Sequence, residues 1–519
     1  MLRLPDKVGA VGVILMVLIL GMVETTWALG EVHTSAVTVA QLVEAENSVT
    51  HALQEYVKKE ETRLGTIKQY IRSWQGGLVD YVHNPINSFH LLRRVTKEYH
   101  AVQESLHDTF AEAVLANLRV LRESVQLPVE ADLNGAAYAL VRLQHIYNLS
   151  IDDLIDGHIR NKKAIQMLSA DDCLRMAQQS FNNLEFELSE KWYQKVVELL
   201  MAEQPLTHHV HLMIDKLVKQ KEHRVMLRTL VTQMAKDSDD TVLDQFSGLG
   251  IPTSFQKQIY EDHDQEYVQL EKLDHLYSGL CRGDVTQPPE AYAGLKCGYA
   301  YSHDYRRLMP FKVELRWADP IIVVYHDVLS EAEISTVKHI ASPRLETTMV
   351  HSFTTHQMQK SLARVGKTAW VQRGDDTTVD RILQRIEDMT GLTTDTSEDF
   401  HVLNYGIGGH YDAHVDFFDL QNKSLDKAPH LGDRLATMLF YLNDVEAGGS
   451  TVFPTLAVEV PARQGSALFW FNLERNGKGD YRTMHAACPV LLGEKWIANL
   501  WLHEFGQEFR WPCTLDPKD

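Results

Sequence analysis

Positive charge is scarce in this sequence. Against 70 Asp and Glu residues there are 51 Lys and Arg, and the formal net charge is −19. Nucleic acids are bound mainly through positive charge on the protein. We therefore expect no nucleic acid partner, whereas an acidic chain of this kind would suit a basic, extended substrate.

Long apolar runs are also lacking, apart from one at the N-terminus. Arg3 and Lys7 precede an apolar run from Val8 to Val23, and small residues follow around Ala28. This order is typical of a secretory signal peptide, which we place at residues 1–30 with cleavage after Ala28 or Gly30. The alternative is an uncleaved anchor, but the run is short of the ~20 residues that a span needs. We expect no membrane span in the mature chain.

Cysteine is rare, with five residues in 519. In the oxidising compartment that a signal peptide implies, an even subset of them can pair. Cys281 with Cys297 and Cys488 with Cys513 are the pairs that close short loops. Cys173 is then left over, and we expect it buried in a helix as a small apolar residue. Asn148 and Asn422 begin N-x-S patterns and are candidate glycosylation sites.

A chain of this length is expected to form two to four domains. Residues 31–160 are predicted to be helical, because their apolar residues begin with a 3-4-3-4 spacing. These residues are Leu42, Ala45, Val49, Ala52 and Tyr56. A similar pattern follows Pro85. Two or three heptads are too few for a long coiled coil, so the stretch either folds back as a helical hairpin or pairs two chains.

Residues 161–255 are predicted to form further helices. Ser169 to Asp172 has the pattern of a helix start, and a second helix passes through Phe186, Trp192 and Val196. Such a helix pair with aromatic packing residues suggests a tetratricopeptide-like unit. Residues 256–312, with an acidic helix from Gln256 to Tyr277 and a cysteine-bounded loop, read as a linker.

The pattern changes to strands in residues 313–519. A capping box from Ser330 to Glu333 opens one helix, and a second is expected from Val379 to Met389. Strand runs separated by glycine turns follow, at Arg434–Leu442, Ser466–Phe471 and Lys495–His503. Short strands at this spacing favour a jelly roll, also called a double-stranded β-helix. The expected fold class is therefore multidomain α+β, with all-α N-terminal regions before this β domain.

The chemistry is concentrated in His414, Asp416 and His485. A strand sends residues i and i+2 to the same face, so His414 and Asp416 would share one space. With His485 as a third ligand, the set gives the two-His-one-carboxylate triad of non-haem Fe(II) oxygenases.

Lys495, a buried cation at the start of an apolar strand, needs an anionic partner, and a 2-oxo acid would supply a carboxylate. We interpret His410, His430 and His503 as structural.

Three segments, NYGIGGHYDAHVD, DRLATMLFYLNDVEAGGSTVFP and GDYRTMHAACPVLLGEKWIANLWLHE, occur in this order. Together they closely resemble the catalytic domain of the collagen prolyl 4-hydroxylase α-subunit family. The resemblance implies hydroxylation of peptidyl proline in X-Pro-Gly sequences, with O2 and 2-oxoglutarate consumed and succinate and CO2 released. It implies Fe(II) and ascorbate as cofactors. It also implies that Lys495, Tyr405 and Thr437 contact 2-oxoglutarate, although a core tyrosine and a sheet threonine are alternatives.

The same resemblance implies partners and a location. The family works in the endoplasmic reticulum lumen as an α2β2 assembly with protein disulfide isomerase, and its N-terminal helices pair two α-subunits. This chain lacks a K-D-E-L type ending, so a partner would have to retain it. The family's disulfides correspond to the two short-loop pairs named above.

One departure from the family concerns peptide binding by residues 161–255. The family typically has tyrosines where this chain has Phe181, Phe186 and Glu187. The peptide preference is thus open, and a secretory-pathway hydroxylase with a non-collagen substrate is an alternative. A non-catalytic peptide-binding subunit is another, but the retention of His414, Asp416, His485 and Lys495 argues against it.

Overall fold

A computed structural model describes residues 34–73, 128–183, 185–202, 275–285, 287, 289–301, 307–348, 363–418 and 431–514, together with 101–102, 273, 350–351 and 358–359. The chain divides into two compact units. One consists of Thr38–Leu127, and the other of Met1–Val37 with Pro128–Asp519. Asn422, His430, most of the expected acidic helix and the heptad pattern after Pro85 lie outside the described residues.

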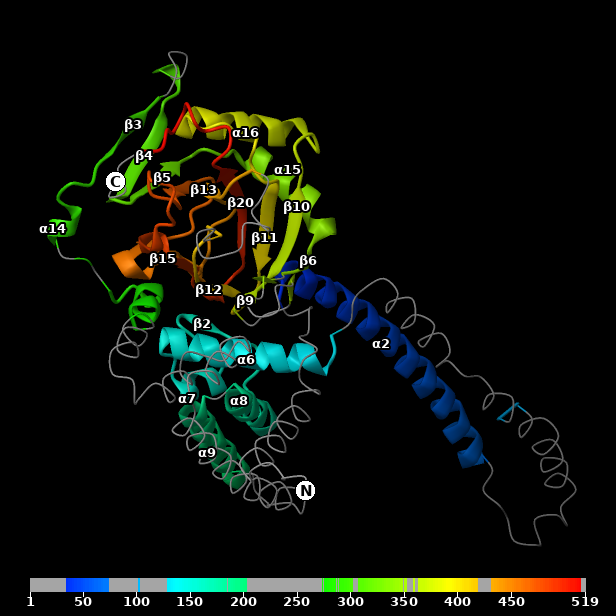
Figure 1. The fold of residues 1–519 in the computed structure, drawn as a ribbon. Coiled ribbons are helices and arrows are strands. Elements are labelled where there is room, and N and C mark those ends of the chain that lie inside the picture. The colour runs from blue at the N-terminus through cyan, green and yellow to red at the C-terminus, as the bar shows by residue number, and fades with distance from the viewer. Residues whose placement is uncertain are drawn as a thin grey trace, which may run out of the picture. The chain divides into compact units, whose positions relative to one another are not determined.

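The smaller unit contains most of one long helix, α2 (Ala36–Ser73) (Figure 1). The predicted 3-4-3-4 pattern therefore does form a helix. Several large apolar side chains on it are exposed, namely Val39, Val43, Leu53, Val57, Leu64 and Ile71. Self-association through this helix stays a prediction.

The larger unit begins with a group of helices. Its members are α6 (Glu130–Tyr147), α7 (Ile151–Ile155), α8 (Ala170–Asn182) and α9 (Phe186–Ala202), with a small hairpin of β1 (His158–Ile159) and β2 (Lys162–Lys163). The capping box that Ser169 and Asp172 predict opens α8. In the shared core, the fully buried Trp192 donates its indole N–H to Gln144 Oε1 at 2.8 Å. Cys173 is free and fully buried there, as predicted.

Two sheets make up the rest of the unit, and in the described part every pairing in them is antiparallel. The larger has the order β3 (Cys297–Ala300), β4 (Phe311–Ala318), β5 (Ile321–His326), β17 (Ala467–Phe471), β13 (Arg434–Tyr441), β20 (Lys495–His503), β11 (Phe400–Tyr405), β10 (Lys367–Val371), β6 (Glu346–Thr347). The smaller has the order β16 (Val458–Val460), β15 (Thr451–Phe453), β18 (His485–Ala487), β12 (His410–His414), β9 (Arg364–Val365). The three predicted strand runs correspond to β13, β17 and β20.

Several short elements complete the described part. They are the strand pairs β14 (Ala447–Gly448) with β19 (Val490–Leu492) and β7 (Val350–His351) with β8 (Met358–Gln359), and the single turns α14 (Pro289–Tyr292), η5 (Ser342–Arg344), η7 (Pro454–Leu456) and η8 (Tyr481–Thr483).

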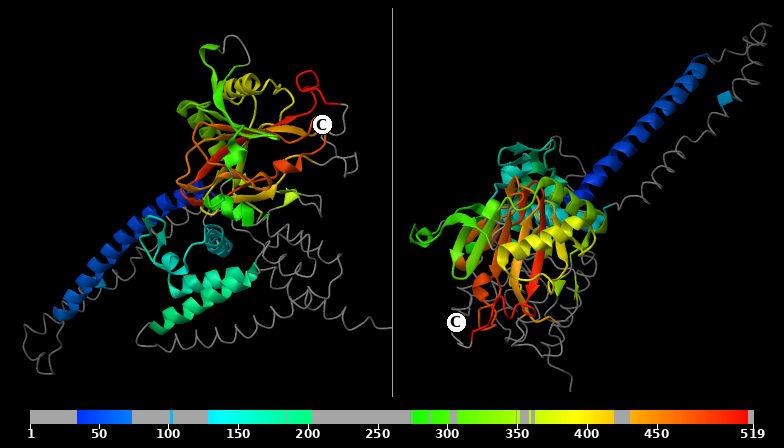
Figure 2. Two further views of the ribbon diagram at one scale, coloured as in Figure 1. Left: turned by 90° about the vertical axis from the view of Figure 1, so that its left-hand side faces the viewer. Right: turned by 90° about the horizontal axis from the view of Figure 1, so that it is seen from above.

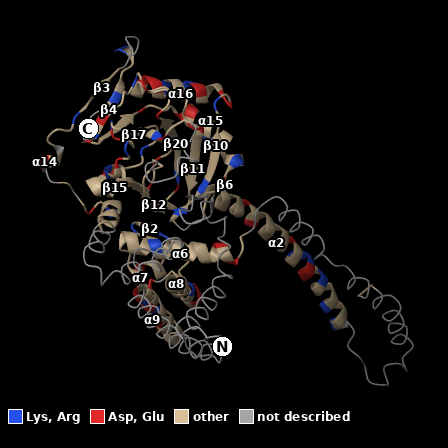
Figure 3. Ribbon diagram, viewed as in Figure 1, with Lys and Arg blue, Asp and Glu red and all other residues tan. Residues whose placement is uncertain are grey.

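Two helices cover one face of the larger sheet. They are α15 (Glu331–Ala341), which opens on the predicted Ser330–Glu333 capping box, and α16 (Thr377–Thr390) (Figure 2). Ile382 and Ile386 of α16 are buried in the core with sheet residues such as Phe440. Acidic residues occur along both helices (Figure 3), and Glu331 and Asp380 among them are exposed. The amphipathic pattern of the helices thus decides which side of each helix faces the sheet.

The opposite face of the larger sheet meets the smaller sheet. Phe453 of β15 packs in one core cluster with Tyr405, Trp470 and Ile497 of the larger sheet. We call the side of the larger sheet that carries these residues its inner face. Among the described residues, no helix combines the length and the hydropathy that a membrane crossing needs.

The disulfide arrangement differs from the prediction. The structure joins Cys281 to Cys488, with the two Cα atoms 5.5 Å apart, and leaves Cys297 and Cys513 exposed and free. The predicted pairs, Cys281 with Cys297 and Cys488 with Cys513, are therefore wrong in this structure. Sequence separation was a poor guide, because folding brings the helical segment that holds Cys281 against the residue that follows β18.

This disulfide lies at a contact between the helices and the sheets. Tyr147, the last residue of α6, donates its hydroxyl to Pro489 O at 2.5 Å, one residue after Cys488. Arg282 Nη1 donates to Ile146 O at 2.9 Å. The cross-link and these hydrogen bonds together tie α6 to the end of β18.

We expect peptide mapping without reduction to recover Cys281 joined to Cys488. Cys297 and Cys513 should alkylate in the folded protein, and Cys173 only after unfolding, because it is fully buried. The cross-link spans 207 residues, and closing a loop of that size stabilises the fold by roughly 5 kcal/mol in the chain-entropy model. The double variant Cys281→Ser/Cys488→Ser should accordingly melt at a lower temperature. Recovery of Cys281 joined to Cys297 would contradict the arrangement seen here.

Candidate metal centre

Two neighbouring strands supply the histidines of the site. His414 is the last residue of β12, and His485 is the first residue of β18. The two residues are directly paired across the antiparallel ladder. Directly opposite residues of such a ladder have neighbouring side chains. The pairing thus brings together two histidines that are far apart in the sequence.

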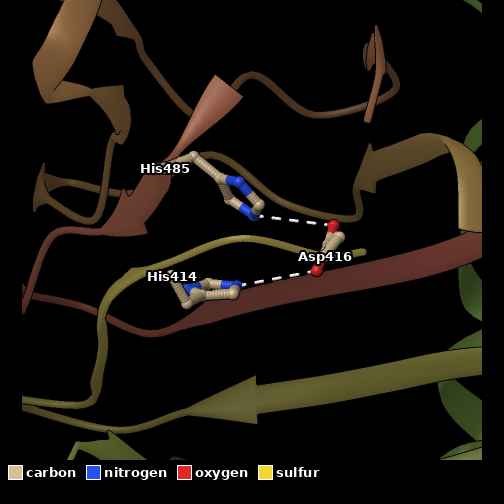
Figure 4. A group of neighbouring side chains, drawn as sticks. All are labelled: His414, Asp416 and His485. Atoms are coloured by element: carbon tan, nitrogen blue, oxygen red, sulfur yellow. Dashed lines mark ion pairs between the residues drawn. The ribbon is translucent and has the colours of Figure 1, made fainter. Parts of the chain in front are cut away.

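The carboxylate comes from just beyond the first strand. β12 ends at His414, and Asp416 lies in the bend that follows the strand. The sequence pattern had predicted that both residues belong to the strand, which is wrong for Asp416. Its side chain still turns to the same space. Asp416 Oδ1 is 3.7 Å from His414 Nε2, and Asp416 Oδ2 is 3.6 Å from His485 Nε2 (Figure 4).

The three side chains are arranged to hold one metal ion. One ligand atom from each lies within 4.8 Å of the other two, and they form the only such group of three or more His, Cys, Asp or Glu found in the described part of the chain. Asp416 and His485 are buried, and His414 is partly buried. Two imidazoles and one carboxylate are the donor set of the facial triad that binds Fe(II).

Backbone carbonyls orient both imidazoles. Nδ1 of His414 lies 2.8 Å from Asp412 O, and Nδ1 of His485 lies 3.1 Å from Thr483 O. A carbonyl oxygen only accepts, so in each ring Nδ1 carries the proton and Nε2 keeps a free lone pair. This is how histidine ligands are usually prepared for a metal.

The protonation states also suit a cation. Burial is the main cause that lowers the pKa of His414 to about 3, and the neighbouring imidazole of His485 lowers it further. Burial alone would raise the pKa of Asp416, but His485, His414 and Arg434 hold it at about 2. The site therefore presents a neutral His414 and an ionised carboxylate at neutral pH.

Lys495 has a buried ammonium group without a hydrogen-bond partner in the described part of the chain. The residue is 1% exposed, and its Nζ lies 5.7 Å from the centroid of the Tyr441 ring. Burial lowers the pKa of Lys495 to about 7. It begins β20 opposite Tyr405, and both side chains project from the inner face of the sheet. A buried cation costs free energy unless an anion pairs with it, and a carboxylate of a 2-oxo acid would supply that anion.

The other two residues predicted to contact 2-oxoglutarate lie in different surroundings. Tyr405 is buried opposite Lys495 in the register, and burial raises the pKa of its hydroxyl while the nearby charge of Arg364 opposes that shift. Thr437 donates its hydroxyl to Asp416 Oδ2 at 2.7 Å and accepts from Asn472 Nδ2 at 2.9 Å. Contact of either residue with 2-oxoglutarate stays a prediction. The structure shows that Thr437 holds the carboxylate of Asp416.

Sequence reasoning missed Arg434 and Glu398. Arg434 Nη1 donates to Asp416 O at 3.3 Å, and the guanidinium lies 3.8 Å from the centroid of Trp501. Two hydrogen bonds, of 2.5 Å and 3.1 Å, join Arg434 to the carboxylate of Glu398. Nothing in the local sequence marks either residue, because they come from different strands and turns.

The two described histidines that we interpreted as structural lie outside the triad. His503 contacts Glu398 Oε1 at 3.2 Å through Nε2, and its Nδ1 donates to Gly432 O at 2.8 Å. His410 is buried, and its Nε2 is 3.3 Å from Asp412 Oδ1.

Two family models match this chain. "Prolyl 4-Hydroxylase alpha-subunit, N-terminal region" matches residues 35–161, and "2OG-Fe(II) oxygenase superfamily" matches residues 400–503. The second range contains His414, Asp416, His485 and Lys495.

Among solved structures, the chain is similar to a viral collagen prolyl hydroxylase from Paramecium Bursaria Chlorella virus-1 in a complex with 2OG. The two are 25% identical, and the match covers 35% of this chain and 94% of that chain, with a TM-score of 0.28.

Two curated relatives match over nearly the full length. Prolyl 4-hydroxylase subunit alpha-2 of Caenorhabditis elegans is 33% identical over 512 residues, which cover 94% of each chain. Prolyl 4-hydroxylase subunit alpha-1 of Rattus norvegicus is 34% identical, with 93% of this chain and 95% of the relative covered. At this identity and coverage, the chain belongs to the prolyl 4-hydroxylase α-subunit family.

Proposed function

We propose that this chain is the catalytic subunit of a procollagen-proline 4-hydroxylase, acting on proline in X-Pro-Gly sequences. The observation that carries this proposal is the combination of one metal triad with one unpartnered buried lysine in a member of this family. The triad suits Fe(II), and the lysine suits a dicarboxylate. A non-catalytic peptide-binding subunit would need neither.

The residues of the site have separate tasks in this proposal. When bound, Fe(II) supplies the oxidative chemistry, in which 2-oxoglutarate and O2 give succinate and CO2 and one oxygen atom enters the proline ring. His414, Asp416 and His485 would hold the metal. Lys495 would bind the distal carboxylate of 2-oxoglutarate and fix its orientation in the dry interior.

The finer architecture is part of the proposal. Two antiparallel sheets that face each other support a double-stranded β-helix for residues 313–519. The packed pair of α8 and α9 supports a tetratricopeptide-like module for residues 161–255. Residues 31–160 would be the dimerisation domain, and 256–312 the linker.

The departures in the peptide-binding module affect its preference. Phe181 and Phe186 pack edge to face at 5.4 Å, and Glu187 pairs on the exposed surface with Lys191 at 2.9 Å. None of the three supplies a tyrosine hydroxyl to a peptide. A related secretory-pathway hydroxylase with a non-collagen substrate is the alternative that this observation favours.

The cellular setting follows from the family and the expected signal peptide. We propose action in the endoplasmic reticulum lumen, with ascorbate as reductant and protein disulfide isomerase as the partner in an α2β2 assembly. Asn148, a candidate glycosylation site, is exposed at the C-terminal end of α6.

Replacement of a triad residue tests the metal site. We expect His414→Ala, Asp416→Ala and His485→Ala each to lower succinate release by about a hundredfold or more, since even outer-shell changes cost 10–100-fold. Iron affinity should fall while the melting temperature changes little. His339→Ala, an exposed histidine on α15, is the matched control. Wild-type turnover by any triad variant would remove that residue from the triad.

Lys495→Ala tests the lysine. Leaving a buried carboxylate without its partner costs about 2–5 kcal/mol. The concentration of 2-oxoglutarate at half-saturation should therefore rise roughly thirtyfold to several thousandfold. Lys495→Arg should recover part of the loss. Lys338→Ala, which removes a lysine that lies over the neighbouring Trp496, is the control. An unchanged half-saturation in Lys495→Ala would mean that the cosubstrate is anchored elsewhere.

The pH dependence offers a further test. Burial lowers the pKa of Lys495 to about 7, so the free protein loses the ammonium charge above that pH. The carboxylate of 2-oxoglutarate binds the charged form of Lys495, so above pH 7 the lysine must take up a proton when 2-oxoglutarate binds. The half-saturation concentration for 2-oxoglutarate should rise as pH increases above 7, approaching tenfold per pH unit. Lys495→Arg keeps its charge and should show a flat profile. A flat profile in the wild type would contradict the assignment.

A further inference from the structure

The first described residues of the chain are buried at the end of β11. Thr34 and Ser35, which directly precede α2, are 7% and 0% exposed. The backbone N–H of Gly406 donates to Thr34 O at 3.2 Å, and Ser35 Oγ donates to Asn404 Oδ1 at 2.6 Å. Ser35 and Asn404 are 369 positions apart in the sequence. We call Thr34 and Ser35 the N-terminal anchor.

Asn404 connects the N-terminal anchor to the turn before β20. Its side chain is fully buried, and its Nδ2 donates to Glu494 Oε2 at 3.1 Å. The indole N–H of Trp496 donates to the same carboxylate oxygen at 3.0 Å. The Ser35 hydroxyl occupies the acceptor end of the Asn404 amide and leaves the donor end for Glu494. Ser35 thus fixes the direction in which this amide points.

A second asparagine holds the same turn from the backbone side. Asn443 Nδ2 donates to Glu494 O at 2.8 Å, and Asn443 Oδ1 accepts from the backbone N–H of Trp496 at 2.7 Å. Glu494 and Trp496 are the two neighbours of Lys495 in the chain. Hydrogen bonds therefore hold the backbone on both sides of this lysine.

The strand register brings this network against the cosubstrate lysine. Asn404 pairs with Trp496, and the next pair is Tyr405 with Lys495. Trp496 belongs to the core beneath the helices, whereas Tyr405 packs on the inner face of the sheet. Alternation along the strands thus puts Asn404 on one face and the Lys495 side chain on the other. The network holds the backbone from which Lys495 projects, and it leaves the ammonium group available to a ligand.

We propose that Ser35 is a positioning residue for the cosubstrate site, which acts on Lys495 through Asn404 and Glu494. A long, flexible lysine binds a carboxylate well only where its backbone and surroundings hold it in place. The inference rests on the proposed function, in which Lys495 binds the distal carboxylate of 2-oxoglutarate. It gives the segment before α2 a part in that binding.

Ser35→Ala in the full chain tests the proposal, with 2-oxoglutarate titrated at saturating iron and peptide. The half-saturation concentration should rise roughly two- to tenfold, the factor that corresponds to one hydrogen bond, while kcat stays as in the wild type. Ser35→Thr keeps a hydroxyl and should restore the wild-type value. Ser48→Ala is the matched control, because the exposed Ser48 donates only within α2, to Glu44 O, and it should change nothing.

A double variant separates positioning from general stabilisation. If Ser35 acts through Lys495, Ser35→Ala should cause no further rise in half-saturation when Lys495 is already replaced by alanine. A residue that only stabilises the fold would change the half-saturation by the same factor in both backgrounds. That result, or an unchanged half-saturation in Ser35→Ala, would overturn the inference. An unchanged half-saturation in Lys495→Ala alone would instead overturn the proposed function.

Discussion

The antiparallel pairing of His414 with His485 is the constraint on which the site depends. It places two imidazoles side by side at one end of a two-strand ladder. The bend after β12 adds the carboxylate of Asp416. Carbonyl groups of the same segments orient both rings. The geometry of the triad is therefore a property of the backbone, and the surrounding side chains adjust it.

Around this ladder, the interior is dry but not apolar. Among the described residues, several buried donors have no hydrogen-bond partner, although native interiors usually satisfy such groups. They include Lys495 Nζ, Trp501 Nε1 and Arg364 Nε. Buried polar groups without hydrogen bonds destabilise a protein core, whereas a ligand that pairs with them removes that cost. The buried charge without a hydrogen-bond partner is the physical reason to expect an anionic cosubstrate at Lys495.

The helical part of the larger unit is joined to the smaller sheet, which carries His414 and His485. The Cys281–Cys488 bond and the hydrogen bond from Tyr147 to Pro489 both act just after β18. They hold the end of the ladder that lies away from the triad. The residues expected to bind peptide and the residues expected to carry out the reaction thus belong to one compact unit. The sequence patterns of the helices and of the strands did not predict this.

The sequence by itself determined the elements and the reactive residues. Capping boxes and strand runs predicted α8, α15, β13 and β20, because these depend on local hydrogen bonds and on alternation. The H-x-D pattern pointed to the chemistry only together with His485, Lys495 and the resemblance of the three surrounding segments to a known family. Tertiary structure alone decided the partner of Cys281, the support of Asp416 by Thr437 and Arg434, and the stacking of Trp370 on His401. Each of these joins residues from different elements, and local pattern carries no information about which distant segments meet.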